Sequence, residues 1–177
     1  MITITDRPAR LGSSINTRTE KHGDEDIPSA DIPITGIMLS AEELNSLLGD
    51  PHASRALFNN DKGVKRPMFR CFKPFRLTEK FEGARVSLAL SVLNDNGVVV
   101  EIKDCKLAKI DLEPCEGGLT AMSLQIQSVP TEAQIGELFG HLNREISIEI
   151  ADGKRVEKSG GKQAELPMNH DQDDRVE

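Results

Sequence analysis

The amino-acid sequence predicts a β-rich protein of the α+β class, with an antiparallel sheet or sandwich, one or two covering helices and a disordered acidic C-terminal tail. Three observations favour this fold. Apolar and polar residues alternate over several short segments, which is the period of half-buried strands. Two other segments carry helix-start signals. Apolar content collapses after residue 151, so the end of the chain cannot bury enough surface to offset its ordering entropy.

We therefore expect three regions: a flexible N-terminus at 1–12, a single β-rich domain at 13–151 and the acidic tail at 152–177. A chain of 177 residues is long enough for one domain with its own core. That core must rest on Leu, Ile, Val and six Phe, because the chain has neither Trp nor Tyr.

The first strands are predicted by alternation over residues 13–20 and 30–39. Pro33 fits the second of these only at a sheet edge, because proline has no amide hydrogen to donate. The strongest strand signal is a hairpin over 85–103, in which two alternating runs flank an Asn-Gly turn at 94–97. Three further strands are expected near 107–112, 119–129 and 144–151.

Two helices are predicted by capping boxes, in which the first residue caps the helix and a Glu or Gln three residues later closes the box. Ser40 and Glu43 form the first, and the helix ends at Gly49. Thr131 and Gln134 form the second. Apolar residues at helical spacing follow the second box, so one face of that helix is buried. A further helical turn is expected at 51–58, and 59–82 is the least regular ordered part.

Charge is distributed unevenly along the chain. The net charge is -7, yet residues 61–110 contain 11 basic and 6 acidic residues, a surplus of five positive charges. A basic middle inside an acidic protein is compatible with a local nucleic-acid groove. No apolar run approaches the roughly 20 residues needed to cross a bilayer. Three Cys and an N-terminus without a signal-peptide pattern predict a cytoplasmic protein.

Residues 62–81 carry the strongest candidate for binding chemistry, with seven Lys or Arg and four of the six Phe. Single-strand binders combine cationic grooves with aromatic side chains on which bases stack. The alternative is a strand or loop whose Phe side chains enter the core while its charges face water. The candidate nucleic-acid-binding residues are Lys65, Arg66, Phe69, Arg70, Phe72, Lys73, Phe75 and Arg76.

Other clusters favour no catalytic residue, no metal site and no cofactor. The acidic loop at 22–26 has oxygen ligands for a cation, but its spacing is not that of an EF-hand, and a solvated loop is the simpler interpretation. The three Cys form no CxxC pair, and the four His are scattered. The acidic tail either keeps the protein soluble, or mimics nucleic acid or shields the basic segment.

Several segments resemble a family of uncharacterised proteins from tailed phages and prophages. The resemblance covers about residues 13–150 and rests on 16–32, 82–86, 105–110, 116–120, the helix around 135–138 and the final strand. This sequence departs from the family in having no Trp. The family brings no catalytic residue. It implies a phage gene, often found among genes for recombination or host takeover.

Three functions follow as hypotheses. The first is a non-enzymatic phage accessory or host-takeover protein that binds a protein partner. The second is a single-stranded nucleic-acid-binding accessory of phage recombination or replication, acting through 62–81. The third is a metal-dependent enzyme that uses the 22–26 loop. A sheet with free edges could also pair with a second copy across a two-fold axis to give a homo-oligomer.

Overall fold

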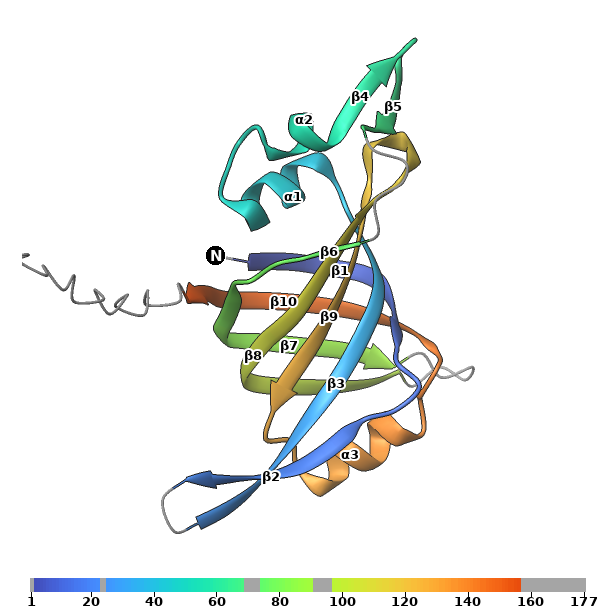
Figure 1. Ribbon diagram of the computed structural model, residues 1–177. Coiled ribbons are helices and arrows are strands. Elements are labelled where there is room, and N and C mark those ends of the chain that lie inside the picture. Colours follow the sequence, from blue (N-terminus) through green and yellow to red (C-terminus); the bar gives the residue numbers. More distant parts are fainter. Residues whose placement is uncertain (1, 23–24, 69–73, 91–96, 157–177) are drawn as a thin grey trace, which may run out of the picture.

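The computed structural model describes residues 2–22, 25–68, 74–90 and 97–156. Antiparallel strands dominate it and three short α-helices accompany them, which confirms the β-rich α+β class (Figure 1). The strands are β1 (Ile2–Leu11), β2 (Asn16–His22), β3 (Glu25–Leu39), β4 (Phe58–Asp61), β5 (Val64–Pro67), β6 (Phe75–Arg76), β7 (Lys80–Leu90), β8 (Val98–Pro114), β9 (Thr120–Ser128) and β10 (Glu145–Val156). The helices are α1 (Ala41–Leu48), α2 (Ala53–Leu57), α3 (Glu132–Phe139) and the 3-10 turn η1 (Glu116–Gly118).

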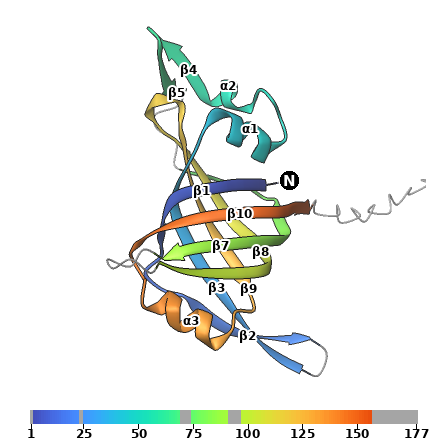
Figure 2. The ribbon, with the colours of Figure 1, turned by 180° about the vertical axis from the view of Figure 1, so that it is seen from behind.

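The main sheet closes on itself. Its strands pair in the order β1-β10-β7-β8-β9-β3, and a further pairing between β1 and β3 joins the two ends. Figures 1 and 2 show the ring from opposite sides. β2 extends one end of the ring as a ribbon with β3, and β6 pairs with β8. The interior is filled by inward-facing Ile, Leu and Val side chains of all six ring strands.

The N-terminus is a structural strand, so the expectation of a flexible segment at 1–12 is wrong for Ile2–Leu11. β1 pairs with β10 along most of its length and with β3 at Leu11, and so closes the ring. Its register shifts between Ile4 and Arg7, around Asp6 with its positive φ of 44°. The buried side chains therefore change phase: Ile2 and Ile4 point inward before the bulge, and Ala9 and Leu11 after it. This change of phase removes the simple alternation that predicts a strand.

Pro33 lies inside the sheet rather than at an edge. β3 pairs with β9 on one side, and on the other side with β2 as far as Asp31 and with β1 from Ile34. The carbonyl of Pro33 accepts a hydrogen bond from the Gly12 backbone N–H at 2.8 Å, so its nitrogen also faces this second side. Pro33 lies between the last residue of β3 that pairs with β2 and the first that pairs with β1. Its missing N–H therefore removes no hydrogen bond of the sheet.

Two strands are longer than the sequence predicts. β8 joins the predicted strands at 98–102 and 107–112, and its positive-φ residues Asp104 and Lys109 let it leave β7 and pair with β9. β10 continues to Val156, so the first residues of the expected tail form a strand paired with β7. Residues 157–177 of that tail, and the turn residues 94–96, lie outside the described residues.

Both capping boxes form as predicted. In α1 the Glu43 backbone N–H donates to Ser40 Oγ at 3.3 Å, and in α3 the Gln134 backbone N–H donates to Thr131 Oγ1 at 3.2 Å. Gly49 ends α1 with a left-handed φ of 71°. The two helices lie at opposite ends of the ring (Figure 1). α1 shares its end with α2 and the β4–β5 hairpin, which project away from the sheet.

Candidate binding site on the arm

The projecting segment α2, β4 and β5, residues 53–67, is here called the arm. Its hairpin turns at Lys62 and Gly63, both with positive φ (52° and 84°), as a two-residue type I′ turn requires. Across the hairpin Phe58 pairs with Pro67, and Asn60 pairs with Lys65. Residues paired in this way share one face of the ribbon. The hairpin therefore has an inner face towards the body and an outer face in solvent.

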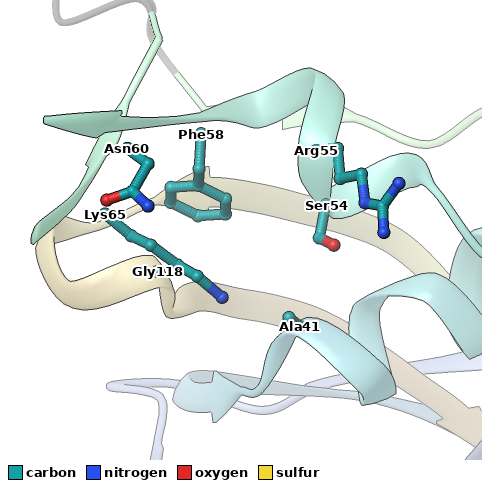
Figure 3. Close-up of a pocket in the computed structure, with 7 residues that line it drawn as sticks. All are labelled: Ala41, Ser54, Arg55, Phe58, Asn60, Lys65 and Gly118. Atoms are coloured by element: carbon teal, nitrogen blue, oxygen red, sulfur yellow. The ribbon is translucent and has the colours of Figure 1, made fainter. Parts of the chain in front are cut away.

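The inner face covers a cavity of about 350 Å³ at the base of the arm (Figure 3). The cavity lies between α1, α2, the hairpin and η1. Its walls are formed by Ala41, Ser54, Arg55, Phe58, Asn60, Lys65 and Gly118. Figure 3 shows the Phe58 ring over the cavity, with the Lys65 side chain reaching in below it and Ser54 and Arg55 on the opposite side.

Lys65 is positioned by a glycine far away in the sequence. A Cβ built on Gly118 would lie 2.6 Å from Lys65 Cδ and 3.1 Å from its Cβ, so the aliphatic stem of Lys65 rests directly on the Gly118 backbone. Gly117 and Gly118 both have positive φ (83° and 80°), which glycine adopts at little cost. These two glycines thus form a turn against which the Lys65 side chain packs.

The cavity is positively charged in an acidic protein. Of the described residues that line it, Arg55 and Lys65 are cationic and none is acidic. Within the described part of the chain, the side chains of Ser54, Arg55, Asn60 and Lys65 make no hydrogen bond or ion pair. Arg66, on the outer face, differs, since it lies 3.2 Å from the carboxylate of Asp61. Arg55 and Lys65 therefore line the cavity without a described acidic partner, whereas Lys62 lies at the hairpin turn outside it.

The outer face exposes apolar side chains. Val64 is 47% exposed, and Met68, directly after β5, is 37% exposed. Lys62 and Arg66 flank them in the sequence. Exposed apolar side chains with charged neighbours on a projecting segment are compatible with a docking surface.

The eight residues predicted from the sequence do not form one site. Lys65 lines the cavity and Arg66 pairs with Asp61. Phe75 is half-buried and packs against the core, as the alternative hypothesis for the segment expects. Phe69, Arg70, Phe72 and Lys73 lie outside the described residues.

Arg76 is also engaged within the protein. Its guanidinium donates two hydrogen bonds of 2.7 Å to the carboxylate of Asp111. These bonds and the opposite charge raise the pKa of Arg76 above its ordinary value. The guanidinium is exposed, but its fork of donors is already used by the carboxylate.

Sequence reasoning did not find most of the cavity. Arg55 and Asn60 carry no motif, and Phe58 is an isolated Phe before the basic segment. The sequence does carry one signal for the hairpin. Asp-Lys-Gly at 61–63 is compatible with a tight turn between two short strands. Which face that hairpin presents, and what it covers, is decided by packing against η1.

Burial makes Cys105 a poor nucleophile. Desolvation raises the pKa of the Cys105 thiol to about 12, and the thiol donates to the carbonyl oxygen of Ile102 at 3.3 Å. Within the described ranges, no three His, Cys, Asp or Glu side chains are grouped to hold a metal ion. Residues 23–24 of the acidic loop lie outside those ranges. No helix that the structure describes has the length and apolar character needed to span a bilayer.

Comparison of the chain with protein-family models, with curated proteins and with solved structures gives no match.

Proposed function

We propose that this protein is a non-enzymatic accessory protein that acts by binding a protein partner through the outer face of the arm. The observation that carries the proposal is the exposure of Val64 on a hairpin that projects from a closed sheet, and of Met68 directly after that hairpin. A closed sheet and a projecting hairpin with an exposed apolar side chain suit recognition of another surface, because little ordering entropy is lost on docking.

The resemblance to tailed-phage proteins supports a host protein as the partner, bound during host takeover. Lys62 beside Val64 favours a partner surface that carries a carboxylate next to an apolar centre. The partner class is thus an acidic bacterial protein, such as a replication or defence factor.

Single-stranded nucleic acid is the second candidate. Residues 53–68 contain four basic residues and one acidic residue, a surplus of three positive charges. Non-specific binding to nucleic acid needs such a surplus. The aromatic half of the hypothesis has less support, because Phe75 packs against the core and Arg76 is bonded to Asp111.

The test compares affinity capture from host lysate by three forms of the full chain. The arm variant combines Val64→Ser with Met68→Ser. The matched control combines Val129→Ser with Phe139→Ser at the other end of the molecule. Val129 lies just before α3 and is 58% exposed, and Phe139 is the last residue of α3 and is 47% exposed. We expect the wild type and the control to capture the same protein and the arm variant to lose it.

Two outcomes would contradict the proposal. Equal capture by the arm variant would place the docking surface elsewhere. A labelled single-stranded oligonucleotide bound with micromolar affinity, weakened by salt and by Lys62→Gln with Arg66→Gln, would instead favour the second candidate.

A further inference from the structure

The cavity under the arm uses side chains that the proposed docking surface does not. Val64 and Arg66 alternate with Lys65 along β5, so they point to opposite faces of the ribbon. The cavity residues would therefore be free for a separate ligand while a partner occupies the outer face. The cavity and the outer face are therefore separate surfaces.

The positive charge of the cavity favours an anionic ligand. Arg55 and Lys65 line the cavity without an acidic neighbour among its described lining residues, although the whole chain carries a net charge of -7. Neither cation has an ion-pair partner in the described residues that would have to be displaced. Lys is a common phosphate binder as a point charge, and Arg adds a planar fork of donors.

Part of the Lys65 side chain packs against the protein, although the residue as a whole is exposed. Its stem rests on Gly118, where a Cβ would come within 2.6 Å of Cδ. Figure 3 shows the ammonium group extended into the space below the Phe58 ring. Because the stem is already ordered, binding of an anion costs less side-chain entropy than at a freely rotating lysine.

The size of the cavity and its remaining wall residues favour a ligand larger than an inorganic anion. A cavity of about 350 Å³ is far larger than the roughly 10–15 Å³ that holds one water molecule, so inorganic phosphate would fill only part of it. Phe58 supplies a flat apolar wall against which a ring can stack. The Asn60 amide and the Ser54 hydroxyl supply donors and acceptors for the polar edge of such a ring.

We propose that this cavity binds a free small molecule that joins a phosphate group to a flat aromatic body, the chemical class of the mononucleotides. Lys65 binds the phosphate, and Arg55 on the opposite side of the cavity adds to its positive potential. The aromatic body lies against Phe58, and Asn60 and Ser54 bond to its edge. The same phosphate chemistry also occurs at the end of a nucleic-acid strand, so the test distinguishes these two sources.

The test is isothermal titration of the full chain with the 5′-monophosphates of adenosine, cytidine, guanosine and uridine. Each nucleoside and inorganic phosphate are titrated alongside. We expect at least one monophosphate to bind with Kd below about 1 mM and about tenfold more tightly than its nucleoside and than phosphate. Lys65→Met should weaken it about tenfold or more. Lys62→Met, at the hairpin turn and outside the cavity lining, should leave it unchanged.

Thermal unfolding without ligand checks that both variants keep the wild-type midpoint temperature. If Lys65→Met lowers that midpoint, Arg55→Gln serves as a second cavity variant. The proposal is overturned if no monophosphate binds at millimolar concentration, if a nucleoside binds as tightly as its monophosphate, or if Lys62→Met weakens binding as much as the cavity variants. A 5′-phosphorylated hexanucleotide that binds about tenfold more tightly than every mononucleotide would also overturn it, and would favour a strand end as the ligand.

Discussion

The aliphatic stem of Lys65 rests on the backbone of Gly118, although the two residues lie 53 positions apart in the chain. This contact joins the arm to η1, and so ties the projecting hairpin to the closed sheet. It also directs the only cation of β5's inner face into the cavity, within the described part of the chain. The glycine thereby sets the position of a charge.

Replacing Gly118 by Ala should cost more stability than replacing Gly117. Both residues have a positive φ, so each Ala costs about 1 kcal/mol of unfolding free energy through the backbone alone. Only at position 118 does the new Cβ also meet Lys65, and we expect a further loss of about 1 kcal/mol. Urea denaturation measures both. The further loss should become smaller when Gly118→Ala is combined with Lys65→Ala, which removes Cδ at 2.6 Å and leaves Cβ at 3.1 Å; an equal loss in the two single variants would contradict the contact.

Glu43 should make stability depend on pH in the acidic range. Burial would raise its pKa, but hydrogen bonds from the Ser40 backbone N–H at 2.7 Å and from Arg7 lower it below the ordinary value. A lowered folded pKa means that the stabilisation is present above the unfolded pKa and is lost as the pH falls through the folded pKa.

We therefore expect Glu43→Gln to lower the unfolding free energy by about 1 kcal/mol at neutral pH. The difference from the wild type should shrink as the pH falls from about 5 to about 3. Urea denaturation over this pH range tests the expectation. Glu42→Gln in the same helical turn is the control, and a difference that grew on acidification would refute the sign.

Cys105 should be protected from thiol reagents in the native state. Its thiol is buried, and a pKa raised to about 12 leaves very little thiolate at neutral pH. In a Cys71→Ser background, we expect Ellman's reagent to modify the half-buried Cys115 quickly and Cys105 only on unfolding. Rapid reaction of two thiols in the folded protein would contradict this burial.

Removing β1 should prevent cooperative folding. β1 closes the ring between β10 and β3 and buries Ile2, Ile4 and Leu11, so its loss exposes two strand edges and part of the core. We expect a chain that starts at residue 12 to show no cooperative thermal transition by circular dichroism. A chain that ends at residue 156 is the control and should keep the wild-type Tm. A truncated N-terminus with an unchanged Tm would show that closure is dispensable.

Phe75 should affect stability rather than nucleic-acid affinity. It is half-buried against the core and pairs with Leu112 through β6 and β8, so Phe75→Ala should cost about 2 kcal/mol of unfolding free energy. Anisotropy titration with a single-stranded oligonucleotide should show the same affinity before and after the change. A weaker affinity for the oligonucleotide with unchanged stability would instead show that Phe75 takes part in base stacking.

The local elements could be read from the sequence because their determinants are close together in the chain. Ser40 with Glu43 and Thr131 with Gln134 are three residues apart, and each pair forms its capping box. The alternation in β7, β9 and β10 likewise predicts which side chains are buried. Where bulges change the phase, as at Asp6 in β1, the same reasoning fails.

The candidate site was predictable only in part. Lys65 was selected for its charge, and the structure places it in a cavity. The same argument selected Phe75 and Arg76, which the structure assigns to the core and to an ion pair with Asp111. Composition identifies residues able to bind, but it does not tell which of them the fold already uses.

The sequence by itself determined the β-rich class and the two capped helices, because hydrophobic period and capping act over a few residues. Tertiary structure alone decided that the sheet closes through β1 and β3, and that Lys65 meets Gly118. Both depend on register shifts and turns that accumulate along the chain and bring distant residues together. No local pattern encodes that sum, so the ring and the cavity exist only once the whole sheet has formed.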